Sequence, residues 1–171
     1  MTTLIVCPLR LVPQIVANRS PSHLITLLGP EEMIETPAGI EAERHLKLGI
    51  NDIDEVAEGM TAPSEETVVS LLAFGRTWDA TAPLLIHCWA GISRSSASAY
   101  ILAVERNPHA DEAAIARALR AASPYVQPNR RMIRLADDIM GRGGRMADAV
   151  EAMTPHQMTY ENVPFEFSHR Y

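Results

Sequence analysis

Short apolar runs alternate along the chain with longer segments whose apolar residues recur at helical spacing. The short runs predict buried strands at residues 4–6, 24–28, 45–48 and 84–87. The second run ends at Gly29-Pro30, a pair that commonly ends a strand in a turn. Because strands and helices alternate, the pattern predicts an α/β fold with three layers, in which helices flank a mostly parallel central sheet.

The segments with helical spacing predict a series of helices. We expect a short helix or an irregular connection at residues 9–18, where Pro13 interrupts the pattern. Ser64 is a typical helix N-cap, and the segment after it has one apolar face. That face consists of Val68, Leu71, Leu72, Gly75 and Trp78. Further helices are expected at residues 96–106, 111–122, 130–140 and 146–153.

Charge and cysteine content exclude several classes of protein. A net charge of -6 gives no bulk attraction to nucleic acid or to an acidic membrane, so we expect neither as a partner. The two cysteines, Cys7 and Cys88, are too few for a disulfide scaffold, and the histidines lack metal-ligand spacing, so we expect no metal and no cofactor. The sequence shows neither a signal peptide nor a run of transmembrane length, so we expect a cytoplasmic protein.

The most informative segment is residues 87–95, which read HCWAGISRS and join a predicted strand to a predicted helix. Backbone N–H groups at a helix start are unpaired and lie at the positive end of the helix dipole, so this turn suits a phosphate dianion. Arg94 can add a two-pronged guanidinium contact, and Gly91 can take a positive φ. The same electropositive loop should stabilise a thiolate at Cys88, which would then face phosphorus as a nucleophile.

The spacing His-Cys-x-x-Gly-x-x-Arg-Ser resembles the active-site loop of the cysteine-dependent protein tyrosine and dual-specificity phosphatases. Residues 123–129 resemble the Pro-Asn helix start that follows this loop in the same superfamily, so the resemblance spans about residues 23–140. It implies a phosphatase domain at residues 1–145. The glycine-rich residues 141–145 predict a flexible hinge, and we expect the helix and aromatic tail at 146–171 to pack on the same domain.

The resemblance also implies a role for each residue of the loop. Cys88 would be the nucleophile, Arg94 would bind phosphate, and Ser95 would assist release of the thiolate. His87 would order the loop. The remaining residues expected to surround the phosphate are Trp89, Ala90, Gly91, Ile92 and Ser93.

A phosphatase also needs an acid, because an alkoxide or phenoxide leaves phosphorus slowly unless its oxygen is protonated. Asp52 and Asp54 follow a predicted strand. In dual-specificity phosphatases the acid lies some three dozen positions before the cysteine, often in an Asn-Asp pair. Asp52 follows an asparagine and lies 36 positions before Cys88, so the resemblance favours Asp52. Asp54 remains the alternative, and either aspartate is also typical of a turn or a helix cap.

Three functions use a cysteine in an anion-binding loop. The first is a tyrosine or dual-specificity protein phosphatase that works through a cysteinyl-phosphate intermediate. The others are a catalytically silent phosphate-binding module and a rhodanese-like sulfurtransferase. The presence of Cys88, Arg94 and Ser95 together with Asp52 favours the phosphatase. Its expected partner is a phosphorylated protein or a small phosphate monoester, and phosphate, sulfate or vanadate should occupy the loop.

Two other features have ordinary explanations. Cys7 is expected to be a core residue at the end of the first strand, and only a position close to Cys88 would let it trap the oxidised thiol as a disulfide. Residues 130–145 contain five arginines, which we interpret as a solvated helix side rather than a surface for a phosphoprotein.

Overall fold

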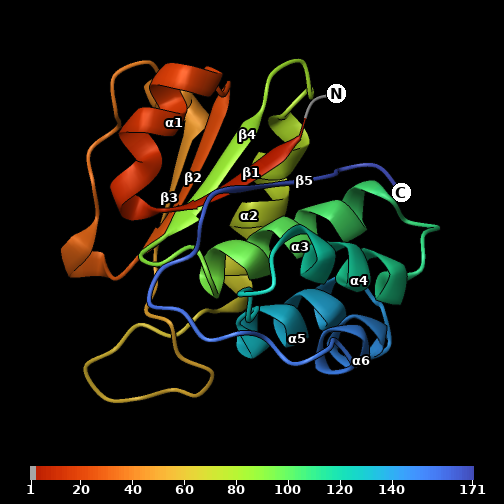
Figure 1. Ribbon diagram of the computed structural model, residues 1–171. Coiled ribbons are helices and arrows are strands. Elements are labelled where there is room, and N and C mark those ends of the chain that lie inside the picture. The colour runs from red at the N-terminus through yellow and green to blue at the C-terminus, as the bar shows by residue number, and fades with distance from the viewer. Residues whose placement is uncertain (1–2) are drawn as a thin grey trace.

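The apolar runs of the sequence form a central sheet in the computed structural model, which describes residues 3–171 (Figure 1). Over these residues the sheet has five strands: β1 (Leu4–Pro8), β2 (His23–Leu28), β3 (His45–Gly49), β4 (Leu84–Cys88) and β5 (Phe165–Phe167). Their order is β3-β2-β4-β1-β5. The neighbours among β1 to β4 pair in parallel, and β5 pairs antiparallel with β1. The prediction of a mostly parallel sheet is therefore confirmed.

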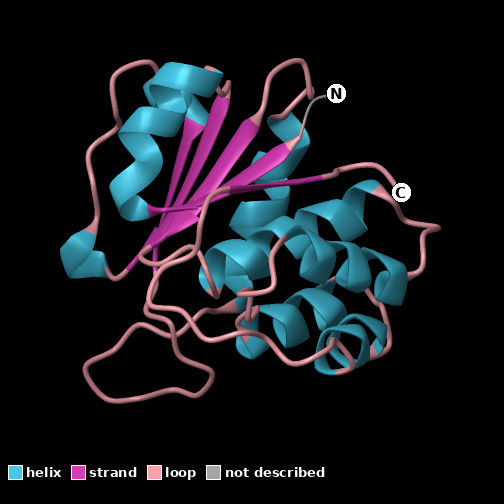
Figure 2. Ribbon diagram, in the orientation of Figure 1, coloured by secondary structure: helices cyan, strands magenta, loops and turns pink. Residues whose placement is uncertain are grey.

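Helices cover both faces of the sheet, as Figure 2 shows, so the predicted three-layer α/β fold is confirmed as well. Within residues 3–171 the α-helices are α1 (Val12–Arg19), α2 (Glu65–Thr77), α3 (Arg94–Arg106), α4 (Glu112–Ala122), α5 (Arg130–Ile139) and α6 (Arg145–Glu151). Three short 3-10 helices lie at Leu9–Leu11, Pro30–Glu32 and Ala42–Arg44. No helix in this part of the chain is long and apolar enough to cross a membrane.

The two faces of the sheet bury different clusters of side chains. On one face, α1 packs over Ile5 and Cys7 of β1, Leu24 of β2 and Leu85 of β4. The opposite face carries the larger cluster, to which α2 to α6 contribute. Because both faces are covered, the central strands are apolar at nearly every position, which explains why their sequences are short apolar runs rather than alternating ones.

The sheet also explains where polar loop residues gather. The carboxyl ends of parallel strands meet at one edge, which is where ligands bind in folds of this class. The chain leaves β4 there and enters α3, and it leaves β3 there and enters residues 50–64 before α2. The two loops that carry the predicted nucleophile and the predicted acid therefore lie on the same side of the molecule (Figure 1).

The glycine-rich residues 141–145 do not form a flexible hinge, contrary to the prediction. The Asp137 carboxylate accepts hydrogen bonds from the backbone N–H groups of Gly144 and Met146 at 2.6 and 2.7 Å. Arg142 is only 9% exposed and pairs with Glu112 at 3.2 Å, so it is not on a solvated helix side either. The glycines serve a tight turn, in which three of them take a positive φ.

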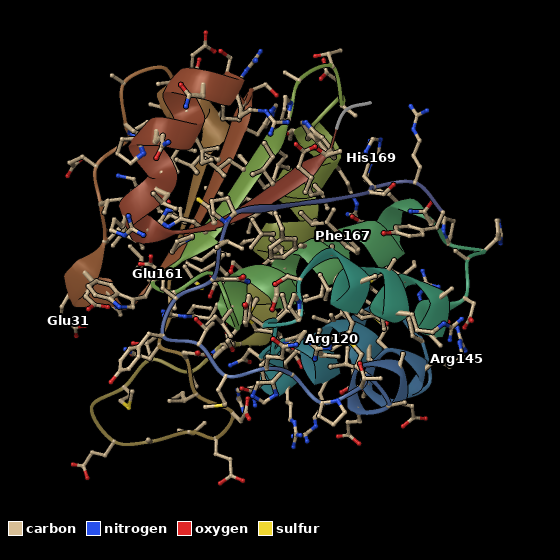
Figure 3. The ribbon with its side chains drawn as sticks, viewed as in Figure 1. Glu31, Arg120, Arg145, Glu161, Phe167 and His169 are labelled. Atoms are coloured by element: carbon tan, nitrogen blue, oxygen red, sulfur yellow. The ribbon has the colours of Figure 1, made fainter. Side chains whose placement is uncertain are left out.

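The chain after α6 returns along the helices to the sheet, where β5 pairs with β1, and then runs to the end of α3 (Figure 1). The Arg120 guanidinium, labelled in Figure 3, donates to the carbonyls of Thr154 and Val126 and so ties this return segment to the end of α4. β5 then places Phe165 and Phe167 in the larger core. A strand at this position was not predicted from the sequence.

Candidate active site

The loop from Cys88 to Arg94 crosses from the carboxyl end of β4 to the first residue of α3. It borders a cavity of about 380 Å³. The Cys88 side chain is 2% exposed and lines this cavity, so its sulfur lies at the bottom of an open site rather than in the sealed core. The cavity is also lined by Trp89, Ala90, Ile92, Ser93, Arg94 and the two candidate acids, Asp52 and Asp54.

Every carbonyl oxygen of residues 88–93 accepts a hydrogen bond, that of Cys88 from the adjacent His87 ring and the other five from distant segments. The donors are His87 Nδ1 to Cys88 O at 3.2 Å, Leu9 N to Trp89 O at 3.0 Å, Asn162 N to Ala90 O at 2.9 Å, Asn162 Nδ2 to Gly91 O at 2.9 Å, Gln127 N to Ile92 O at 3.0 Å and Asn129 N to Ser93 O at 3.3 Å. The carbonyl of each of these six residues is therefore held in place.

These anchored carbonyls determine where the backbone N–H groups point. In a planar trans peptide the N–H lies opposite the carbonyl of the preceding residue, so the N–H groups of residues 89–94 face the other side of the loop, where the cavity lies. None of them has an acceptor within residues 3–171. Six unpaired donors beside a helix N-terminus form an anion-binding cradle, which we call the anion cradle below.

Gly91 meets two separate requirements of this loop. Its φ is +70°, a conformation that other residues adopt only with strain. A Cβ atom at this position would also lie 2.9 Å from the backbone of Cys7 and Pro8 on β1. Glycine thus lets the loop turn sharply while it stays in contact with the neighbouring strand.

Arg94 is a buried cation with an incomplete set of partners. Its side chain is 7% exposed, and its Nη1 donates to the carbonyl of Ile50 at 2.8 Å. Its Nε is buried without a hydrogen-bond partner, and no carboxylate among the described residues pairs with it. A buried charge without a counter-ion is costly, so the guanidinium favours an anion in the adjoining cavity.

The two cysteines lie on adjacent strands in different surroundings. Cys88 Sγ is 3.1 Å from the Ser95 hydroxyl, which is fully buried and can donate to a thiolate. Cys7 packs in the cluster under α1 on the opposite face of the sheet. Burial, and secondly the charge of Cys88, raise the pKa of the Cys7 thiol to about 12, so Cys7 stays protonated at neutral pH. Its surroundings agree with the interpretation of Cys7 as a core residue.

Asp52 lies against the loop of residues 88–94, which we call the catalytic loop after the role expected from its sequence. Its Oδ1 accepts hydrogen bonds from the Ser93 hydroxyl at 2.7 Å and from the Asn129 side-chain amide at 2.9 Å. Its Oδ2 has no hydrogen-bond partner within residues 3–171. The carboxyl group is thus oriented through one oxygen while the other is left to exchange a proton.

Asp54 has a different position. Its Oδ1 accepts a long hydrogen bond, 3.4 Å, from the backbone N–H of Arg131 in the first turn of α5. This is the contact expected of a carboxylate beside a helix N-terminus, which is one of the ordinary explanations for either aspartate. Both carboxyl groups border the cavity, but Asp52 is the one bonded to a residue of the catalytic loop.

Asn162 is a site residue that sequence reasoning missed. It is 2% exposed, supplies two of the six donors to the loop, and its Oδ1 accepts a hydrogen bond from the Ser123 hydroxyl at 3.0 Å. Its partner Gly91 lies 71 positions earlier in the sequence. No local pattern marks such a residue, because its role arises only when the C-terminal segment folds back over the loop.

This chain resembles known proteins in structure but not in overall sequence. The sequence matches no family model and no curated protein. The structure resembles that of DUSP15 with a TM-score of 0.64 at 16% identity, covering 92% of this chain and 96% of that chain. It also resembles PTPMT1 in complex with PI(5)P, with a TM-score of 0.55 at 15% identity, over 80% and 87% of the two chains.

A third solved structure, a mouse putative dual specificity phosphatase complexed with zinc tungstate, gives a TM-score of 0.54 at 14% identity and covers 81% and 79% of the two chains. At these identities the likeness concerns the fold. The chain therefore has the fold of the dual-specificity and tyrosine phosphatases, as the resemblance of the loop implied.

Proposed function

We propose that this chain is a cysteine-dependent phosphatase that hydrolyses phosphate monoesters on tyrosine, or on serine and threonine as well. One arrangement carries the proposal: the Cys88 sulfur lines a cavity beside a loop whose six backbone N–H groups have no acceptor within residues 3–171, next to a buried guanidinium that has no counter-ion there. Such a site binds a tetrahedral dianion and places a nucleophile beside it.

In the first step the anion cradle and Arg94 would hold the three non-bridging phosphate oxygens. The Cys88 thiolate attacks phosphorus, so that an S–P bond forms while the bond from phosphorus to the leaving oxygen breaks. Asp52 donates a proton to that oxygen from its free Oδ2. Because the donors are already in place, they can stabilise the charge of the transition state without first rearranging.

In the second step a water molecule attacks the phosphocysteine. The Asp52 carboxylate removes a proton from that water, the S–P bond breaks, and phosphate leaves. The Ser95 hydroxyl, 3.1 Å from Cys88 Sγ, donates a hydrogen bond to the departing thiolate. The cycle ends with Asp52 protonated and Cys88 ionised, as it began.

The loop also suggests which phosphate ester is preferred. The side chains between Cys88 and Arg94 carry no charge, so only the backbone N–H groups and Arg94 would bind the phosphate. PTPMT1, a structural neighbour, is known in complex with PI(5)P, and that lipid is therefore the natural competitor in a test. We expect this chain to turn over a singly phosphorylated peptide faster than PI(5)P in vesicles.

The proposal is tested by the hydrolysis of para-nitrophenyl phosphate in the presence of a chelator. The wild type should turn over, Cys88→Ser should be inactive, and Asp52→Asn should be slower by about 10² to 10⁴-fold. Asp54→Asn is the matched control and should stay within a few-fold of the wild type. Vanadate should inhibit the wild type.

Each other result has a definite meaning. A wild type that binds phosphate but never releases product would be a silent binding module. Transfer of sulfur from thiosulfate to cyanide without ester hydrolysis would indicate a sulfurtransferase. Activity of Cys88→Ser would rule out a covalent intermediate on Cys88. A large loss of turnover in Asp54→Asn, with little loss in Asp52→Asn, would identify Asp54 as the acid.

A further inference from the structure

Beneath the catalytic loop, three buried side chains and the half-buried Thr36 form a continuous chain of hydrogen bonds that crosses three strands. Thr36 Oγ1 lies 2.9 Å from His45 Nδ1, and His45 Nε2 lies 2.7 Å from Thr26 Oγ1. Thr26 Oγ1 lies 2.7 Å from His87 Nε2, and His87 Nδ1 lies 3.2 Å from the carbonyl oxygen of Cys88. Thr26 and His87 are fully buried, and His45 is nearly so.

The end of this chain fixes its direction. The Cys88 carbonyl can only accept, so Nδ1 of His87 must carry a proton. Burial lowers the pKa of His87 to about 4, so the ring is neutral at pH 7 and its Nε2 is an acceptor. Thr26 must therefore donate its single hydroxyl proton to His87.

The same reasoning extends to the other end of the chain. Since the Thr26 proton is used, its oxygen accepts from Nε2–H of His45. Burial, and secondly Lys47, lower the pKa of His45 to about 4, so this ring is neutral too and its Nδ1 accepts from the Thr36 hydroxyl. A single arrangement of protons satisfies all four contacts, and each donor in it points toward Cys88.

We propose that Thr26 and His45 are positioning residues of the catalytic loop: with Thr36 they form a one-directional hydrogen-bond chain that locks His87 in its Nδ1–H form and so fixes the peptide group between Cys88 and Trp89. This assignment goes beyond the role of His87 itself. It assigns a role to three residues outside the sequence motif: Thr26 on β2, His45 on β3 and Thr36 before β3.

The locked peptide group matters because it carries the first donor of the anion cradle. With the Cys88 carbonyl held by His87, planarity turns the Trp89 N–H toward the cavity, next to the sulfur. A neutral His87 with its proton on Nε2 would leave that carbonyl without a donor, and the peptide group would be free to rotate. The sulfur anion would then lose a stabilising dipole.

The charged and titratable groups around the chain favour the same neutral state. Electrostatic effects on His87 come from His45 and Arg94, and on His45 from Lys47, and each of these disfavours a second positive charge. Cys7, level with His87 on β1, stays protonated. The arrangement should therefore persist unchanged from neutral pH down to about pH 5.

The test compares Thr26→Val, which keeps the shape and removes the hydroxyl, with Thr26→Ser, which keeps the hydroxyl. The readout is the pH dependence of Cys88 alkylation by iodoacetamide, with Cys88→Ser to measure any reaction at Cys7. In Thr26→Val the alkylation midpoint should move up by about one pH unit, and ester turnover should fall about tenfold. Thr26→Ser should restore both.

A spectroscopic measurement separates positioning from mere packing. Nitrogen-15 NMR of the His87 ring should show the proton on Nδ1 in the wild type and in Thr26→Ser. Thr26→Val should shift it toward Nε2. If the tautomer and the alkylation midpoint are the same in Thr26→Val as in the wild type, the proposal is wrong.

A second pair of variants covers the case in which Thr26→Val does not fold. His45→Gln keeps an N–H within reach of Thr26, and His45→Leu removes it; His45 is on the edge strand β3, where a change is better tolerated. Equal alkylation midpoints in this pair would also overturn the proposal. Although the inference rests on Cys88 being the proposed nucleophile, alkylation needs no phosphate ester, so a protein without phosphatase activity would still give a clear result.

Discussion

The catalytic loop and the acid loop are held in opposite ways. In the catalytic loop, residues 88–94, the six carbonyls of residues 88–93 are fixed by donors that lie as far apart in the chain as Leu9 and Asn162. The acid loop, residues 51–63, is fixed mainly at its base, where Asn51 and Thr61 exchange two hydrogen bonds of 2.7 and 2.8 Å. Its exposed middle projects away from the body of the molecule (Figure 1).

The difference agrees with what the proposed mechanism requires of each loop. Stabilising charge on a phosphate requires several dipoles that are aimed before the reaction begins, so each peptide group of the catalytic loop must be fixed. Proton transfer requires one side chain within hydrogen-bonding reach of one oxygen. Asp52 obtains that placement from Ser93 and Asn129. The exposed residues 55–60 of its loop make no hydrogen bond to another segment within residues 3–171.

Arg94→Lys should have the largest effect on turnover, because it replaces the only cationic side chain of the catalytic loop. Lysine is a point charge that cannot make the planar two-pronged contact with phosphate. We expect turnover of para-nitrophenyl phosphate to fall about a thousandfold. Binding of vanadate, measured by calorimetry, should weaken in parallel. Near-normal turnover would show that the backbone donors suffice without the guanidinium.

Asn162→Asp tests whether the catalytic loop depends on donors from the distant tail. The substitution keeps the side-chain shape but replaces the Nδ2 donor with an acceptor that faces the Gly91 carbonyl. Turnover should fall between about tenfold and a hundredfold. Met158→Asp adds the same charge at an exposed tail position and should leave turnover unchanged. Equal effects of the two would mean that charge, and not anchoring, is responsible.

Asn129→Ser probes the contact that joins the two loops. Serine can still cap α5, as the Asn129 side chain does through Met132 N, but it cannot donate to Asp52. Turnover should therefore fall about tenfold while the unfolding temperature stays close to that of the wild type. Asn129→Ala should lose turnover similarly and also about 1 kcal/mol of stability. Unchanged turnover in both would mean that Ser93 alone places the acid.

The hydrogen-bond chain under the catalytic loop contains two histidines, His45 and His87, and should make the stability of the fold depend on pH. The acid loop contains no histidine and cannot contribute to this effect. Burial lowers the pKa of folded His87 and His45 to about 4, whereas the unfolded value is about 6.5. The unfolded state therefore binds more protons below pH 6.5, and stability is lost as the pH falls from about 6.5 to 4. The unfolding temperature should drop over this range, and less steeply in His45→Gln.

A substitution in the middle of the acid loop should change turnover and stability very little. Val56 is 76% exposed, so Val56→Ser removes no buried contact. We expect turnover within twofold of the wild type and a change in the free energy of unfolding below about 0.5 kcal/mol. A large loss of turnover would show that the loop middle contacts substrate, and it would weaken the contrast between the loops.

Local sequence patterns were enough to predict four of the strands and the loop between β4 and α3. Those elements depend on apolar periodicity and on residues that lie within nine positions of one another, such as His87 and Ser95. β5 escaped prediction because three residues, Phe165–Phe167, are too short a run to show alternation. The expected hinge at residues 141–145 was wrong because glycine content does not reveal that Asp137 holds the turn.

The residues that support the site could not be predicted in the same way. Thr26 contacts His87 across 61 positions of sequence, and Asn162 contacts Gly91 across 71. His45 reaches His87 only through Thr26. These contacts depend on the sheet order and on the returning tail. A buried polar residue in a strand or a tail has no periodic signature. Its role follows only from which strands are neighbours, and that in turn is decided by packing of the whole domain.

The position of Asn162 has a consequence for how the molecule comes into being. Synthesis proceeds from the amino terminus, so Asn162 leaves the ribosome 71 residues after Gly91, the residue whose carbonyl it holds. A nascent chain can already contain β4 and α3 while two peptide groups of its catalytic loop still lack their partners. Assembly of this loop therefore has to wait for a segment that is translated well after β4 and α3.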